Sequence, residues 1–146
     1  MTVVFCGHSD YVQSRNDQEQ ILNILETAVG DVPCEIFLGG YGNFDSFALR
    51  CAKEFRKSHP NTKLRLISPY LRNGKASYEA EAFDSVIYPS LEHVPPRYAI
   101  SHRNRWMAET ADIVIAYISH QYGGAYTMYL HAKRKGKKIY NLSSLK

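Results

Sequence analysis

The chain has 146 residues, of which 45% are hydrophobic and 22% are charged. This length fits one compact domain over residues 1–146 and is too short for two ordinary domains. No apolar run approaches the ~20 residues that a membrane-spanning helix needs. The first residues also lack the basic and apolar segments of a secretory signal. We therefore expect a cytoplasmic protein with no membrane partner.

The formal net charge of +4 is mild, and its densest part is KRKGKK at residues 133–138. This tract lies where a last helix would end, and cations there complement the helix dipole. A nucleic-acid partner is therefore not favoured. His8, His102, His120 and Cys6 form no tight ligand pair such as CxxC or HExxH, so we expect neither a metal nor another cofactor.

The first half of the chain alternates strands and helices. Strands are predicted at residues 2–6, 34–38 and 63–67, where β-branched and apolar residues are bounded by turn residues. A helix over residues 17–29 is expected to begin with a capping box between Asn16 and Glu19. Apolar residues at helical spacing predict another helix from Phe44 to about residue 57.

The second half continues the alternation. We expect a short helix at residues 77–83, a short strand at 85–88 and a helix beginning near Ser101. The unbroken apolar run IVIAYI at residues 113–118 is typical of a central parallel strand covered on both faces. A helix ending near Lys135 and a strand at residues 138–142 complete the chain.

Such alternation predicts an α/β fold, a Rossmann-like three-layer sandwich with an open, mostly parallel sheet. The carboxyl ends of its strands meet at one edge, where ligands bind. Four polar or glycine-bearing loops gather there, at residues 7–10, 39–45, 68–70 and 119–127. Tyrosines in or beside these loops could stack on a base: Tyr41, Tyr70, Tyr122 and Tyr126.

The stretch after the 113–118 strand predicts an anion site. Gly123 and Gly124 precede a helix, so backbone N–H groups are left pointing outward at its N-terminus. Arg103 and Arg105 lie on the preceding helix, where at least one guanidinium could face the same strand end. If Arg103 does so, replacing it should harm binding but hardly folding. Glycine pairs are also common in turns, and Arg105 fits a solvated helix face better.

The order IFLGGYGNFD, a helical RNRWM, a buried strand and GGAYT resembles the SLOG superfamily. This Rossmann-like group includes the Lonely Guy cytokinin-activating phosphoribohydrolases and the DNA-processing protein DprA. The resemblance spans nearly the whole chain and, by its compact size and RNRWM, is closest to the small YpsA-like branch. It implies a nucleotide or nucleotide-derived ligand, and a homodimer as in the hydrolytic relatives.

The resemblance also implies which residues bind the ligand. Arg103 matches the arginine that contacts the ligand, and GGAYT matches the phosphate loop PGGxGT of the hydrolytic members. The candidate ligand-binding residues are Gly7, His8, Gly39, Gly40, Gly42, Asn43, Arg103, Gly123, Gly124, Ala125 and Thr127. Tyr122 replaces the proline of that loop, and the glutamate expected after Thr127 is absent.

Three functions remain open. A binding or sensing module is favoured, because breaking an N-glycosidic bond needs a carboxylate that the GGAYT loop lacks. The alternative is a nucleoside 5'-monophosphate phosphoribohydrolase or sugar-transfer enzyme, with Arg103 and Asp45 as catalytic candidates and Glu79 or Glu81 as other replacements. A DprA-like DNA-handling protein would need a basic groove.

Overall fold

The computed structural model describes residues 1–70 and 82–145. Six parallel strands form one open sheet in the order β4-β3-β2-β1-β5-β6. The strands are β1 (Thr2–Gly7), β2 (Cys34–Leu38), β3 (Thr62–Ile67), β4 (Ser85–Ile87), β5 (Ile113–Tyr117) and β6 (Lys138–Asn141). The predicted α/β Rossmann-like fold with a parallel sheet is therefore confirmed.

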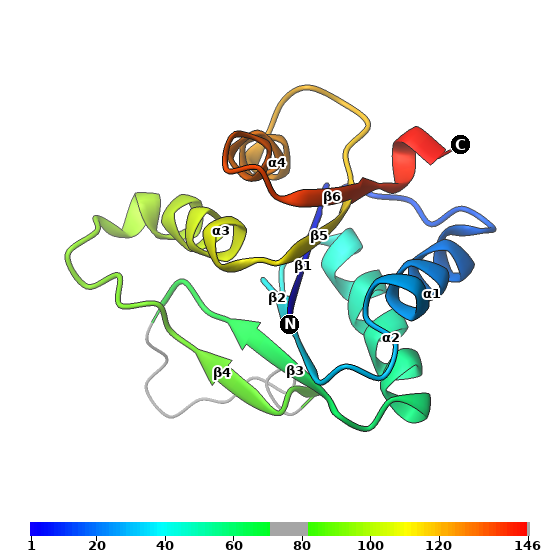
Figure 1. Cartoon of the computed structure of the whole chain (residues 1–146). Helices are drawn as coiled ribbons and strands as arrows, with labels where there is room; N and C mark the ends of the chain where they lie inside the picture. The colour runs from blue at the N-terminus through cyan, green and yellow to red at the C-terminus, as the bar shows by residue number, and fades with distance from the viewer. Residues whose placement is uncertain (71–81, 146) are drawn as a thin grey trace.

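Helices cover both faces of this sheet (Figure 1). They are α1 (Asp17–Ala28), α2 (Asn43–Ser58), α3 (Ala99–Thr110) and α4 (Gly124–Arg134), with short 3-10 helices η2 (Pro96–Tyr98) and η3 (Leu142–Leu145). The helices α1 and α2 lie on one face, and α3 and α4 lie on the other. Within the described ranges, no helix has the length and hydrophobicity needed to cross a bilayer.

The central strands are apolar on both sides because each face meets its own helical layer. In β1, Val3 and Phe5 pack with the residues of α1 and α2, whereas Val4 and Cys6 pack with those of α3 and α4. All four side chains are at most 2% exposed. This two-sided burial explains why β1 and β5 read as continuous apolar runs rather than as alternating strands.

Two local predictions differ from the structure. The capping box is wrong, because Asn16 makes no side-chain cap bond. Instead, the buried carboxylate of Asp17 accepts hydrogen bonds from the Tyr11 hydroxyl and the Ser14 N–H. The helix expected near Ser101 begins two residues earlier, directly after η2. Most of the helix predicted at residues 77–83 lies outside the described residues.

Candidate functional site

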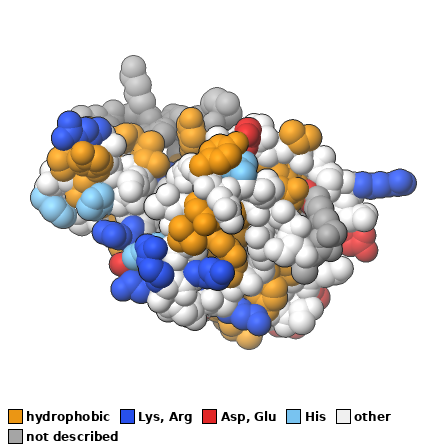
Figure 2. Space-filling model, turned by 90° about the horizontal axis from the view of Figure 1, so that it is seen from above, with side chains coloured by type: hydrophobic (Ala, Val, Ile, Leu, Met, Phe, Trp, Pro, Cys, Tyr) orange, Lys and Arg blue, Asp and Glu red, His pale blue; other side chains and the backbone are white. Residues whose placement is uncertain are grey.

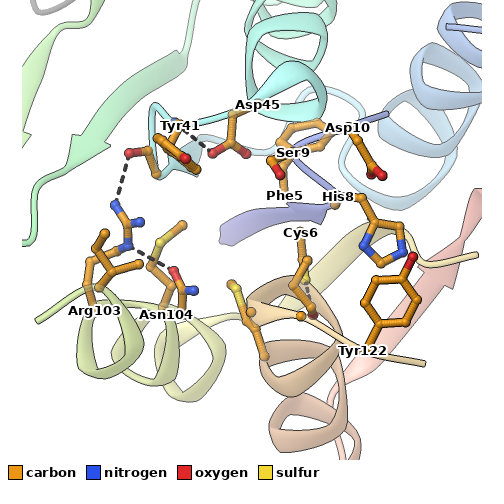
Figure 3. A pocket seen from close by; sticks show the side chains of 18 of the residues that line it. Phe5, Cys6, His8, Ser9, Asp10, Tyr41, Asp45, Arg103, Asn104 and Tyr122 are labelled. Carbon is orange, nitrogen blue, oxygen red and sulfur yellow. Dashed lines mark hydrogen bonds between the residues drawn. The ribbon is translucent and has the colours of Figure 1, made fainter. Parts of the chain in front are cut away.

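The strand order reverses between β1 and β5, at the middle of the sheet. From β1 the chain adds β2, β3 and β4 on one side, and β5 and β6 follow on the other side. In open parallel sheets, ligands bind in the crevice at the carboxyl ends of the two strands that flank such a reversal. A pocket of about 300 Å³ opens there (Figure 3). We call it the switch-point pocket.

The structure brings most of the sequence-predicted residues to this pocket, but not all. Its wall includes Gly7, His8, Gly39, Asp45, Arg103, Gly123, Gly124 and Ala125. Four further candidates are described but do not line it: Gly40, Gly42, Asn43 and Thr127. Among the tyrosines, Tyr41 and Tyr122 contribute to the wall. The alternative carboxylates Glu79 and Glu81 lie outside the described residues.

Arg103 lies under one side of the pocket and holds two strand ends together. It is only 3% exposed. Its Nη1 donates to the carbonyl of Gly39 at 2.9 Å and to that of Ile67 at 2.8 Å, where β2 and β3 end. Its Nε donates to Oδ1 of Asn104 at 2.9 Å. Figure 3 shows the guanidinium between α3 and the first glycine loop.

These contacts correct one expectation about Arg103. A side chain that satisfies two carbonyls at the sheet edge cannot be removed without cost, because buried carbonyls lose their donor. Replacing Arg103 should therefore affect folding as well as binding. Because Nη1 is already engaged by two carbonyls, the terminal nitrogen left for a ligand is Nη2.

The N-terminus of α4 forms the opposite side of the pocket and is open. Among residues 1–70 and 82–145, a Cβ at Gly123 would meet no heavy atom within 4 Å, and one at Gly124 would meet only Nδ2 of Asn104 at 3.9 Å. The first helical bond is donated by the Thr127 N–H to the Gly123 carbonyl. In the part of the chain that the structure describes, no acceptor meets the N–H groups of Gly124 and Ala125. We call this group, residues 123–125, the α4 amide seat.

The first glycine loop, by contrast, is filled by the protein itself. A Cβ at Gly40 would lie 2.5 Å from Leu66, and one at Gly42 would lie 2.7 Å from the Cα of Ser9. The Asn43 N–H donates to the Ser9 carbonyl at 3.0 Å. This packing explains why Gly40, Gly42 and Asn43 do not reach the pocket.

Asp45 is the carboxylic acid deepest in the pocket. Burial raises its pKa to about 6, although the hydrogen bond from the Tyr41 N–H and the charge of Arg103 act in the opposite direction. A carboxyl group with a pKa near neutrality can accept or release a proton at physiological pH. Asp45 thus holds the turn before α2 through the Tyr41 N–H and can also exchange a proton near neutral pH.

An aromatic stack closes the other end of the pocket. The rings of His8 and His120 stack with centroids 3.5 Å apart, and Tyr122 stacks on His120 at 3.7 Å. The Nε2 of His8 accepts the Ser119 N–H at 3.0 Å, so this imidazole is neutral with its proton on Nδ1. Burial and the neighbouring His120 lower the pKa of His8 further.

Sequence reasoning did not single out part of this wall. The missed residues are Phe5, Cys6, Ser9, Asp10, Ile100, Asn104, Met107, His120 and Met128. Ser9, Asp10 and His120 fall in loops already assigned to the ligand edge, so their position was available from the strand assignments. In the sequence, His120 and Cys6 suggest only a metal site. Across residues 1–70 and 82–145, no three His, Cys, Asp or Glu side chains are grouped as a metal site.

The chain was compared with known proteins. No family model matches it, and no curated protein matches it. A crystal structure of TM1055, a structural genomics target, has 16% sequence identity and a TM-score of 0.56. That match covers 94% of this chain and 71% of TM1055.

A second solved structure is DNA processing protein A (DprA) from Helicobacter pylori, described by its single-stranded DNA binding mode. It has 16% identity and a TM-score of 0.61, and the match covers 95% of this chain but 63% of DprA. At this identity the likeness is one of fold. The Rossmann-like fold that the sequence resemblance implied is therefore confirmed.

Proposed function

We propose that this protein binds a nucleotide or a nucleotide-derived ligand, with a phosphate on the α4 amide seat. The observation that carries this proposal is the open helix N-terminus at Gly123 and Gly124, which faces the buried Arg103 across the switch-point pocket. Outward N–H groups and the positive end of the helix dipole favour an anion there. Nη2 of Arg103 adds a charged donor from the other side.

The aromatic stack supports a base as the second part of the ligand. Tyr122 is 68% exposed, and it stacks on His120 with one face only at the pocket rim. A planar base can extend such a stack while the tyrosine hydroxyl stays in water. A phosphate at the seat and a base beside Tyr122 together describe a nucleotide.

A thermal-shift screen of nucleoside monophosphates, dinucleotides and cyclic nucleotides tests this proposal. A ligand present at about 100 times its dissociation constant should stabilise the fold by about 2.7 kcal/mol. Hits should then be measured by calorimetry. A lack of response to every compound, at concentrations up to the millimolar range, would contradict the proposal.

One observation favours an enzyme as the second candidate. The raised pKa of Asp45, about 6, suits a group that removes a proton from water attacking a sugar carbon as the N-glycosidic bond breaks. Incubation with nucleoside 5'-monophosphates should then release free base, and Asp45→Asn should abolish the release while ligand still binds. Binding without base release by the wild type would leave the sensing module as the function.

The likeness in fold to DprA makes DNA handling a third candidate function. Fluorescence anisotropy with a labelled oligothymidylate measures it directly. We expect weak, salt-sensitive binding, since the net charge of +4 is small for a nucleic-acid binder. Tight binding at physiological salt would instead favour a DNA-handling function.

The oligomeric state, the location and the family branch of the protein are further parts of the proposal. We propose a homodimer in the cytoplasm, by analogy with the hydrolytic members of the superfamily, and a place in the small YpsA-like branch. Light scattering at micromolar concentration tests the dimer. A mass of one chain, 16.7 kDa, would contradict it.

A further inference from the structure

A second hollow lies beside the switch-point pocket, between α3 and α4. Its volume is about 410 Å³. Three of its lining residues are arginines, Arg97, Arg105 and Arg134. Figure 2 shows Lys and Arg side chains gathered on this side of the molecule. We call the hollow the α3/α4 groove.

The arginines of the groove are not neutralised by its own wall. No described residue that lines it is acidic. Glu109 is near, but its carboxylate is bound by Nε2 of His131 at 2.9 Å, and this bond, more than the charges of His131, Lys135 and Arg105, lowers the pKa of Glu109. Within the described residues, Arg97, Arg105 and Arg134 form no ion pair with a carboxylate. Among the described residues, no carboxylate therefore neutralises the positive charge of the groove.

The groove adjoins the switch-point pocket. Both hollows are lined by Ile100, Asn104, Gly124 and Met128. Gly124 begins α4, so the α4 amide seat faces both hollows at once. A ligand whose phosphate occupies the seat would therefore lie next to the groove.

The spacing along α4 separates the far end of the groove from the α4 amide seat. Arg134 is ten residues after Gly124, which at 1.5 Å per residue is about 15 Å along the helix. A single phosphate at the seat leaves Arg134 out of contact, and an adjoining phosphate, as in a 5'-diphosphate, extends only slightly farther. An anion set apart from the first by a sugar or a whole nucleoside fits better.

We propose that the α3/α4 groove binds a second phosphate of the same ligand, separated from the first by a sugar or nucleoside. The chemical class is a nucleoside 3',5'-bisphosphate or a short linear dinucleotide. This inference rests on the proposed function and adds the substrate class. A long nucleic-acid strand is the competing occupant, and the experiment below distinguishes it.

The test compares nucleotides that differ only in their phosphates. The 5'-monophosphate, 5'-diphosphate and 3',5'-bisphosphate of adenosine, guanosine, cytidine and uridine are titrated into the protein by calorimetry. For the base that binds best, the bisphosphate should bind at least about tenfold more tightly than the monophosphate, because it gains charged hydrogen bonds. The 5'-diphosphate should show little of that gain.

Variants locate the second phosphate. The double variant Arg105→Ala/Arg134→Ala should lose the tenfold gain and keep the affinity for the monophosphate. Arg15→Ala removes an exposed arginine that lies outside both hollows and should change neither value. Thermal unfolding of each variant checks that the fold is intact.

The outcomes separate the two proposals. The proposed function stands if monophosphates bind and Gly124→Val abolishes that binding. The groove proposal is nevertheless wrong if bisphosphates bind no more tightly than monophosphates. It is also wrong if their tighter binding persists in the double variant. If none of the twelve nucleotides binds, both are wrong. If an oligothymidylate of the same phosphate chemistry binds more tightly than every bisphosphate and loses affinity in the double variant, the groove belongs to nucleic acid.

Discussion

The N-termini of α2 and α4 have the same backbone geometry and different surroundings. Gly42, before α2, has φ 90° and ψ 172°, and Gly123, before α4, has φ 91° and ψ 173°. Both follow a parallel strand by a short loop and both point to the same edge of the sheet. Around Gly42 the protein supplies the partners, since Ser9 packs against it. At Gly123, an added Cβ would meet no heavy atom of the described residues within 4 Å.

The same type of turn is therefore closed before α2, where the protein itself fills the space around Gly42, and open before α4, where Gly123 stands free among the described residues. At α2, the Ser9 carbonyl takes the Asn43 N–H and Asp45 takes the Tyr41 N–H, so the turn is part of the fold. At α4, the corresponding donors remain available to a ligand. A glycine turn after a strand therefore identifies a helix N-terminus, whereas the packing around it decides whether an anion can enter.

The closed turn should be the more sensitive of the two to a side chain. Gly42→Ala should lower the free energy of unfolding by about 4 kcal/mol, because a positive φ is strained and the new Cβ would overlap the Cα of Ser9. Gly123→Ala meets only the backbone strain and should cost roughly 1–2 kcal/mol. Urea unfolding of both variants measures the difference, and equal losses would remove the contrast.

Arg103 extends the closed side of the pocket, so its loss should also affect stability. Arg103→Ala should lower the free energy of unfolding by roughly 3 kcal/mol, since the carbonyls of Gly39 and Ile67 lose their donor. Arg103→Lys should restore only part, because an ammonium cannot reproduce the planar fork. Arg105→Ala, on the exposed side of α3, is the matched control and should stay within about 0.5 kcal/mol. A stable Arg103→Ala protein would show that these bonds are dispensable.

The open turn should respond in binding rather than in stability. Gly124→Val places a side chain where only Nδ2 of Asn104 is near, at 3.9 Å, so unfolding should change by less than about 1 kcal/mol. Affinity for the best nucleotide of the screen should fall at least tenfold, about 1.4 kcal/mol, because the valine occupies the phosphate position. Calorimetry beside urea unfolding reports both quantities. Unchanged affinity would place the phosphate elsewhere.

Asp45 connects the closed turn to the open one through its charge. Its folded pKa, about 6, lies above the usual value of 3.8, so the carboxylate is ionised at pH 7.5 and mostly protonated at pH 5. Asp45→Asn should therefore bind a phosphate more tightly than the wild type at pH 7.5, by on the order of 1 kcal/mol or about fivefold. At pH 5 the two proteins should bind alike. Calorimetry at both pH values gives the ratio of the Asp45→Asn affinity to the wild-type affinity, in which the titration of the phosphate itself cancels. A ratio that does not change with pH would contradict this account.

The same pKa shift has a defined effect on stability. Between pH 6 and pH 4 the folded protein holds the Asp45 proton more often than the unfolded chain does, so this group adds stability as the pH falls. His8 acts in the opposite direction, because its lowered pKa keeps it neutral in the folded state while the unfolded chain takes up a proton.

The fold could be predicted largely from the sequence because its signals are local. Continuous apolar runs identify β1 and β5 as central strands, and glycine or proline residues mark where most elements end. The prediction of a capping box at Asn16 was wrong because a tertiary contact decides how this helix begins. Asp17 is drawn inward by Tyr11, which comes from the preceding loop, and no pattern within the helix contains that contact.

The site was predictable in position more than in detail. Gly123 and Gly124 reach the pocket because a parallel strand must deliver its loop to the ligand edge. Gly40 and Gly42 belong to an equally suggestive loop, yet Leu66 and Ser9 fill the space around them. Such filling depends on residues from β3 and from the loop after β1, whose positions relative to this loop are not contained in a local sequence pattern.

The pairing of β1 with β5 also has a consequence for how the protein folds. The Thr2 N–H donates to the Asp112 carboxylate, a contact between residues 110 positions apart in the chain. Contacts of such long range carry a large loop-closure entropy and form late. Any intermediate built from β1 to β4 alone has an unpaired edge on β1 and lacks the wall of the switch-point pocket that α3, the loop after β5 and α4 supply. Ligand binding during refolding should therefore begin only when this last closure is made.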